Sequence, residues 1–258
     1  MTTVGRGGFG KAKKTIYQGK EAVVKYVNTA GSPQATLATC TINRQDAKLE
    51  GEIQRLFNHT HYVAEVYGIE GHAIYMKYYK DGSLRSQIDA GGANKRRYEC
   101  ALDITRGIKE IHRLNFVHSD IKASNVLVQK NDDILYCYIS DFGGARLKGS
   151  MPIAHTPGFT PANFFKKPLC FEDDIFSLGK LYLELFGKLK YNQIKNINYD
   201  NFFDYVNFRD FTKNYQESGD YGKCNGLMKL VHECINEDST KRPSIDDLIN
   251  YYVYLVYK

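Results

Sequence analysis

The length and composition of the chain limit what kind of protein it is. Its 258 residues are enough for one large domain or for two lobes that share a cleft. Hydrophobic residues make up 43% of the chain and charged residues 25%, which is usual for a soluble globular protein. The net charge of +6 is spread out without a block of like charge, so the composition does not indicate a nucleic-acid-binding surface.

The sequence also argues against a disulfide-rich, zinc-binding or membrane-spanning protein. The six cysteines stand apart and form no Cys-x-x-Cys pair, so we expect reduced thiols and no zinc site. No run of about 18 apolar residues is present, and the first residues do not resemble a signal peptide. We therefore expect a soluble, cytoplasmic protein.

Residues 5–10 form a glycine-rich run, Gly-Arg-Gly-Gly-Phe-Gly. Dinucleotide-binding folds share this pattern, but there it opens a helix. Here the strand-like segments 13–17 and 21–27 follow, joined by a turn at 18–20, so we expect a hairpin. The backbone N–H groups of such a hairpin are able to contact a triphosphate. Taken alone, the run fits an ordinary surface hairpin equally well.

A lysine stands within the second strand of this hairpin. Lys25 follows the apolar residues 22–24, where a lysine needs either solvent or a partner of opposite charge. A helix is predicted at 46–58, and it carries two candidate partners, Glu50 and Glu52. Its apolar face is expected to contain Leu49, Ile53, Leu56 and Phe57.

The chain then predicts further strands and a long helix. Segments 62–67 and 72–79 are expected to be strands on either side of a Gly-Ile-Glu-Gly turn. Helical periodicity extends over 97–114 and leads the chain into the segment 117–128.

The segment 117–128 holds the groups with the clearest chemistry. A carboxylate at Asp120, an ammonium at Lys122 and a carboxamide at Asn125 precede a short apolar strand at 126–128. A loop between buried elements aims its side chains rigidly. These groups can take a proton from a hydroxyl, neutralise a phosphate and coordinate a divalent metal. Asp-Phe-Gly follows at 141–143.

The order of these motifs resembles that of eukaryotic-type protein kinases of the Ser/Thr branch. Thr-Pro-Gly-Phe at 156–159, Asp-x-Phe-Ser-x-Gly at 174–179 and Lys-Arg-Pro at 241–243 continue the resemblance. It implies an α+β, bilobal protein-kinase fold, with a small β-rich lobe carrying one main helix and a larger, mainly helical lobe. The implied arrangement is a single kinase domain over 1–258, with an N-lobe at about 1–79, a hinge at about 77–82 and a C-lobe at about 83–258.

The resemblance also implies cofactors and site residues. ATP and Mg²⁺ are the implied cofactors. Asp120 accepts or orients the proton of the acceptor hydroxyl, Lys122 contacts the γ-phosphate, and Lys25 binds the α- and β-phosphates. Asn125 and Asp141 hold the metal. We expect Glu52 rather than Glu50 to pair with Lys25. The implied ATP-binding residues are Gly5, Gly7, Gly8, Phe9, Gly10, Val23, Lys25, Met76, Lys77, Tyr78, Tyr79 and Leu127.

One departure from the family concerns regulation. Ser119 precedes the catalytic aspartate, where the family usually has an arginine that receives a phosphorylated residue of the activation loop. The segment 143–163 offers Ser150, Thr156 and Thr160 as hydroxyl groups. We therefore expect activity that does not depend on loop phosphorylation, or activation by a regulatory protein partner.

We expect three further residues to have structural rather than chemical roles. His118 is expected to be a packed histidine rather than a base. By resemblance, Asp174 braces the backbone of the catalytic loop. Pro161-Ala162-Asn163 replaces the family's Ala-Pro-Glu, and Asn163 is positioned to offer Arg242 a neutral hydrogen bond in place of the ion pair.

Three other functions remain as alternatives. A kinase-fold binding module without catalysis would usually lack Lys25, Asp120, Asn125 or Asp141, and all are present. A small-molecule phosphotransferase of the aminoglycoside-kinase type shares His-x-Asp and the later Asn, but Lys122 and the Thr-Pro-Gly-Phe segment argue against it. A dinucleotide-binding oxidoreductase conflicts with the hairpin after the glycine run.

Protein substrates are the expected partners, and we expect a monomer that binds neither nucleic acid nor membrane. The degraded Ala-Pro-Glu segment suggests a divergent kinase. If a virus or pathogen encodes it, the expected location is the host cytoplasm or nucleus.

Overall fold

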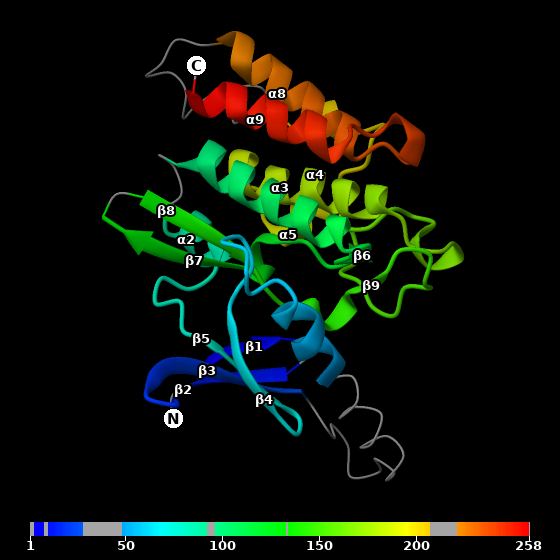
Figure 1. The fold of residues 1–258 in the computed structure, drawn as a ribbon. Helices are drawn as coiled ribbons and strands as arrows, with labels where there is room; N and C mark the ends of the chain where they lie inside the picture. The colour runs from blue at the N-terminus through cyan, green and yellow to red at the C-terminus, as the bar shows by residue number, and fades with distance from the viewer. Residues whose placement is uncertain are drawn as a thin grey trace.

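The computed structural model describes residues 3–7, 10–27, 48–91, 96–132, 134–206 and 221–257. These residues form a sheet with one adjacent helix, followed by a mainly helical part (Figure 1). The expectation of an α+β fold with a small sheet-rich part and a larger helical part is confirmed.

The sheet has five antiparallel strands in the order β1-β2-β3-β5-β4. Its strands are β1 (Thr3–Gly7), β2 (Gly10–Tyr17), β3 (Lys20–Val27), β4 (Val66–Glu70) and β5 (Ala73–Lys77). The predicted hairpin is present as β2 and β3, in which Ala12 pairs with Lys25. On the other side of β3, Lys25 pairs with Ile74, so this lysine lies in the middle of the sheet.

Residues 48–55 form a helix that packs closely on the sheet. A Cβ added at Gly51 would lie 2.8 Å from the Cδ1 atom of Ile69 and 3.3 Å from the Cγ1 atom of Ile74. Glycine at this position therefore lets the helix backbone approach β4 and β5.

The predicted turn at residues 68–71 is wrong in part. Gly68 lies inside β4, and the turn is confined to residues 71–72. The reason is a close approach, since a Cβ at Gly68 would clash with the phenol ring of Tyr17. This glycine makes room for an aromatic side chain rather than allowing the chain to turn.

The helical part is built around α3 and α4, which lie between the outer helices α8 and α9 and two short strand pairs (Figure 1). Its helices are α2 (Leu84–Asp89), α3 (Arg97–Arg113), α4 (Phe171–Gly187), α5 (Tyr191–Ile194), α6 (Phe202–Tyr205), α8 (Tyr221–Cys234) and α9 (Ile245–Tyr257). The strand pairs are β6 (Phe116–Val117) with β9 (Arg146–Leu147), and β7 (Val126–Asn131) with β8 (Ile134–Ile139). Short 3₁₀ turns are η1 (Ala123–Asn125), η2 (Phe142–Gly144), η3 (Phe164–Lys166) and η4 (Ser239–Lys241).

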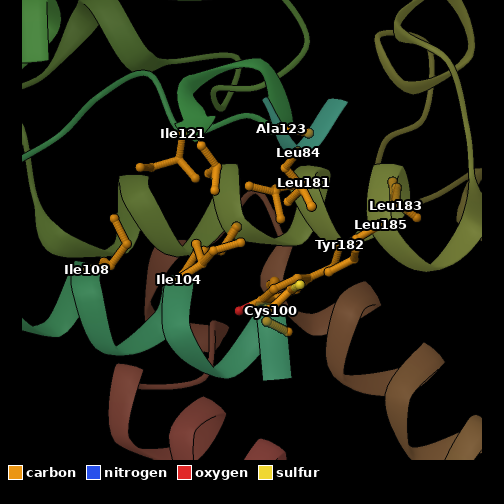
Figure 2. Packing of buried hydrophobic residues seen from close by; sticks show 14 of the residues in the cluster. Leu84, Cys100, Ile104, Ile108, Ile121, Ala123, Leu181, Tyr182, Leu183 and Leu185 are labelled. Carbon is orange, nitrogen blue, oxygen red and sulfur yellow. The ribbon is translucent and has the colours of Figure 1, made fainter. Parts of the chain in front are cut away.

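Helix α4 is the centre of the hydrophobic core. It is buried from Asp173 to Phe186 on all sides, which is typical of a helix enclosed by others. Figure 2 shows leucine and tyrosine side chains of α4 against Ile104 and Ile108 of α3 and against Ile121 and Ala123 of the neighbouring loop. The loop that carries the candidate catalytic groups is therefore attached directly to the core.

This packing predicts a large loss of stability when a core side chain of α4 is shortened. Leu181 is fully buried, so Leu181→Ala should lower the free energy of unfolding by about 2–5 kcal/mol. Leu56 is 50% exposed, so the matched change Leu56→Ala should cost about 0.5 kcal/mol or less. Urea denaturation of the two variants measures the difference. Equal shifts in the unfolding midpoint would contradict this description of the core.

Candidate active site

An ionic cluster connects the sheet, the helix at 48–55 and the Asp-Phe-Gly turn. The Nζ atom of Lys25 lies 2.5 Å from Glu50 Oε1 and 2.6 Å from Asp141 Oδ1. Burial lowers the pKa of Lys25, but the charges and hydrogen bonds of the two carboxylates outweigh it and the pKa is raised. Lys25 is therefore a cation held in place between two separate segments.

The expectation that Glu52 pairs with Lys25 is wrong. Glu50 is 3% exposed and makes the contact, whereas Glu52 is half-buried and pairs with Arg55 at 2.9 Å. The reason is the rotation of the helix about its axis. Its buried face consists of Glu50, Ile53, Gln54 and Phe57.

The two leucines of this helix led to the wrong prediction of its buried face. Leu49 and Leu56 are 43% and 50% exposed, although they were expected on the apolar face. The spacing of Glu50 to Ile53, Gln54 and Phe57 is i, i+3, i+4 and i+7, which is the spacing of one helical face. A search for a polar residue in phase with Ile53 and Phe57 would have selected Glu50.

The backbone of the candidate catalytic loop is held by a buried carboxylate of α4. Asp174 accepts hydrogen bonds from the N–H groups of His118 at 2.8 Å and Ser119 at 2.9 Å. The imidazole of His112 lies 2.9 Å from the same carboxylate. Burial raises the pKa of Asp174, but these contacts, led by the hydrogen bond of His112, lower it overall, so the group stays ionised. The expected bracing role of Asp174 agrees with this geometry.

His118 is a packed side chain, as expected. It is fully buried, and burial lowers its pKa. Its Nε2 atom lies 3.2 Å from Ser140 O, and its Nδ1 atom accepts the N–H of Asp120 at 3.3 Å. The ring meets that of Phe142 edge to face at 4.8 Å. A neutral imidazole satisfies all of these contacts, so His118 supports the loop from beneath.

Asp120, Lys122 and Thr156 form a hydrogen-bonded group at the front of the loop. Thr156 Oγ1 donates to Asp120 Oδ1 at 2.5 Å. Lys122 Nζ lies 2.7 Å from Asp120 Oδ2 and 2.5 Å from Thr156 Oγ1. Burial raises the pKa of Asp120, but the charge of Lys122 and the two hydrogen bonds lower it overall. Asp120 is thus an ionised carboxylate that already accepts a hydrogen bond from a hydroxyl group.

The donor set of Asn125 and Asp141 fits a magnesium ion. The amide nitrogen of Asn125 donates to the backbone oxygen and to Oδ2 of Asp120, both at 2.9 Å. Because its N–H groups are used in this way, the amide oxygen is the atom left for a cation. Asp141 adds a partly exposed carboxylate. Oxygen ligands from an amide and a carboxylate suit Mg²⁺, which takes its remaining ligands from water and phosphates.

The nucleotide side of the expected site is described only in part. Gly8 and Phe9 lie outside the described residues, while Gly7 and Gly10 pair with each other at the end of the β1–β2 hairpin. Val23 and Leu127 are half-buried on β3 and β7.

The structure describes all four implied ATP-binding residues of the predicted hinge region, Met76 to Tyr79. Met76 and Lys77 end β5, and a lysine side chain, that of Lys14, lies 4.1 Å from the ring centre of Tyr78. The side chain of Tyr79, another of the implied ATP-binding residues, is buried in the core. Its ring packs on Tyr138 and its hydroxyl accepts the N–H of Glu65. An aromatic residue at a lobe junction is as able to fill the core as to face a ligand.

Glu184 is a supporting residue that the sequence analysis missed. Its carboxylate accepts the backbone N–H of Ala123 at 2.7 Å and lies 3.4 Å from Arg85. It thereby fixes the backbone between Lys122 and Asn125. The available signal was a glutamate inside the apolar run of α4, since a buried charge needs partners.

The expected hydrogen bond between Asn163 and Arg242 is replaced by others. Arg242 donates to the backbone oxygens of Asn236 and Glu172, each at 2.7 Å. Asp173 lies 3.8 Å away from it. The arginine therefore joins the start of α4 to the turn before α9 without Asn163.

In the part of the chain that the structure describes, no helix has the length and apolar character needed to cross a membrane.

Comparison with known proteins assigns the chain to a family. Residues 1–253 match the model of the protein kinase domain. A probable serine/threonine-protein kinase of Dictyostelium discoideum is 26% identical over 263 residues, covering 96% of this chain and 19% of that protein. A probable LRR receptor-like serine/threonine-protein kinase of Arabidopsis thaliana is 30% identical over 288 residues, covering 96% of this chain and 26% of the relative.

A shorter match adds a third relative. Eukaryotic translation initiation factor 2-alpha kinase 1 of Plasmodium falciparum is 35% identical over 120 residues, which is 44% of this chain and 8% of that protein. Across these and four further relatives, the aligned part makes up only 8–29% of the relative's length. The family model, in contrast, extends over nearly the whole chain, in the region that holds Lys25, Asp120, Asn125 and Asp141. The chain belongs to the protein kinase family.

Proposed function

We propose that this chain transfers the γ-phosphate of ATP to serine or threonine hydroxyls of protein substrates. The observation that carries the proposal is the group of Asp120, Lys122 and Thr156, in which an ionised carboxylate accepts a hydroxyl next to an ammonium. An acceptor serine or threonine presents the same chemical group to Asp120. Protein kinases named as serine/threonine-specific among the relatives support this choice.

The reaction joins the acceptor oxygen to the γ-phosphorus and breaks the bond to the β-phosphate oxygen, so that ADP leaves. Asp120 orients the acceptor hydroxyl and takes its proton. Lys122 neutralises charge on the transferred group, and Lys25 does so at the α- and β-phosphates. Asn125 and Asp141 would hold Mg²⁺, which supplies positive charge to the phosphates. The protein contributes mainly positioning and fixed charges.

Two features favour a protein substrate over a small molecule. Residues 156–160 run directly past Asp120 and are tied to α4, because Ser177 Oγ donates to Phe159 O at 2.7 Å. A backbone segment fixed beside the carboxylate offers an extended surface on which an acceptor chain can lie. The segment 146–167 also carries the cations Arg146, Lys148 and Lys166, which favour acidic or neutral acceptor sequences. The fourth cation of this segment, Lys167, is paired with the buried Asp173 at 2.7 Å.

Regulation through a phosphorylated activation loop is not part of the proposal. Ser119 is buried at φ 71°, where the family usually has the arginine that binds the phosphate. A phosphate on Thr156 would place about two negative charges against Asp120, which is repulsive. We expect the unphosphorylated protein to be active by itself or with a protein partner. A monomer, the lobe boundaries given above and a cytoplasmic location stay predictions.

Asp120→Asn should abolish most of the activity. It keeps the shape of the side chain but removes the proton acceptor, so kcat should fall by about 10²–10⁴-fold. Transfer of label from radioactive ATP to dephosphorylated casein measures this. The control is Asp132→Asn, because Asp132 is exposed at φ 51°, a conformation that asparagine adopts well. Label on a small molecule alone, with none on protein, would contradict the proposal.

Glu50→Gln and Glu52→Gln should separate the two glutamates of the helix. Glu50→Gln removes the buried negative charge that pairs with Lys25. It should lower kcat/KM for ATP by about tenfold or more, since ~1.4 kcal/mol of lost stabilisation has that effect. Glu52→Gln should leave it nearly unchanged, because Glu52 pairs with the exposed Arg55. A larger loss in Glu52→Gln than in Glu50→Gln would refute the assignment from the structure.

Phosphatase treatment should leave the activity of the purified protein in place, because the usual arginine is absent. The measurement compares kcat for casein before and after treatment, with mass spectrometry confirming that Ser150, Thr156 and Thr160 carry no phosphate. Complete loss of activity, with recovery after rephosphorylation by ATP, would show that loop phosphorylation is required.

A further inference from the structure

A buried lysine of α4 makes contacts that the kinase chemistry above does not use. Lys180 is 2% exposed and lies among the apolar side chains of the core helix. Its ammonium donates to the backbone oxygens of Ile197 and, at 3.4 Å, Ile194. It also lies 5.4 Å from the ring centre of Phe176. Burying a charged lysine costs free energy, and its hydrogen bonds to these carbonyl groups offset part of that cost.

Those contacts are at the end of α5. Helix α5 is a single turn. The carbonyl of Ile194 at its end already accepts the N–H of Ile197 at 3.1 Å, so Lys180 is a second donor to that oxygen and also donates to the carbonyl of Ile197 in the following turn. The carbonyl ends of a helix carry partial negative charge, which an ammonium complements. Burial lowers the pKa of Lys180 to about 8 against the opposing charge of Glu237, so most of the protein carries the charged form at pH 7.

Helix α5 in turn lies against the segment that runs past Asp120. Gly158 has φ 83°, and a Cβ at this residue would be 2.5 Å from the Cα atom of Lys195, directly after α5. The rings of Phe159 and Tyr191 stack with centres 6.2 Å apart and 6° between their planes. Residues 158 and 159 therefore pack directly against α5 and the residue that follows it, so a shift of α5 would move them.

The same segment ends at the catalytic group. Phe159 N donates to Thr156 O at 3.0 Å, and Thr156 Oγ1 donates to Asp120. Ser177, one turn before Lys180 on α4, holds Phe159 O. Two side chains of α4 thus fix the segment 156–160, Ser177 directly and Lys180 through α5.

The geometry points to Lys180 as a positioning residue for the protein substrate, which fastens α5 beneath residues 156–160 and so shapes the surface that receives the acceptor segment. This inference rests on the proposed kinase function. Because Lys180 does not contact the nucleotide side of the site, its effect should appear in the binding of protein substrate and not in the use of ATP.

The test is Lys180→Met, which keeps the apolar stem of the side chain and removes the ammonium. KM for dephosphorylated casein should rise about tenfold, the change that ~1.4 kcal/mol of lost binding produces, while kcat and KM for ATP stay close to wild type. The unfolding midpoint should change little, because an apolar replacement also removes the cost of a buried charge. Lys180→Arg retains donors for the carbonyls and should recover part of the loss.

A matched control and a second variant keep the outcome clear. Lys229→Met removes an equal charge from α8, where the side chain is 78% exposed, and should leave KM for casein unchanged. Gly158→Ala disturbs the contact with Lys195 directly. In the double variant, the increase in KM for casein should be smaller than the two single effects combined, because both substitutions act through α5.

The inference is overturned if Lys180→Met keeps the wild-type KM for casein, or if KM for ATP and casein change together with the unfolding midpoint. Full additivity with Gly158→Ala would also overturn it. If the wild-type protein labels no protein substrate at all, the proposed function itself fails, and that result is distinct from any change in the variants.

Discussion

The carboxylate of Asp174 is the constraint on which the candidate active site depends. It is buried at the start of α4 and accepts the N–H groups of His118 and Ser119, the two residues before Asp120. Since α4 is enclosed by the core on all sides, these two hydrogen bonds fix the candidate catalytic loop to a buried helix. Glu184, three turns later on the same helix, fixes the loop again at Ala123. One helix thus holds both ends of the segment that carries Asp120 and Lys122.

A second constraint joins the sheet to this loop. Lys25 comes from the middle of the sheet, Glu50 from the neighbouring helix and Asp141 from the turn after β8. An unpaired charge would be expensive at this depth, so the three groups stabilise one another and define the spacing between the two parts of the fold. Asp141 has φ 67°, a conformation that costs energy for an aspartate and that its contact with Lys25 helps to maintain. Strained residues of this kind are commonly found at functional sites.

The segment after the Asp-Phe-Gly turn is held by contacts that the unmodified side chains of the fold provide. Thr156 is bound by Asp120 and Lys122, Phe159 by Ser177 and by stacking on Tyr191, and Gly158 by its close approach to Lys195. These contacts need no added phosphate. They give a physical account of how a chain with serine at position 119 can keep this segment in place, and they make α4 and α5 its main supports.

The sequence determined the family and the fold because these depend on local patterns and on their order. The hairpin, the long helices, the apolar strand at 126–128 and the motifs from Asp120 to Arg242 follow from spacings along the chain, and the structure has them in the expected places. What the sequence could not supply was the rotation of the helix at 48–55. Hydrophobicity favoured a face with Leu49 and Leu56, but packing on the sheet turned Glu50 inward instead.

Other contacts depended on tertiary structure in the same way. Tyr79 could have faced a ligand or the core, and its fit against Tyr138 decided for the core. Arg242 found carbonyl groups nearer than Asn163. The partners of Lys180, the carbonyl groups of Ile194 and Ile197, come from a segment 14 to 17 residues later in the chain. The sequence by itself determined which groups are present and in which order they occur. Only the packing of distant segments decided which of them meet, because burial selects among partners that local spacing leaves equivalent.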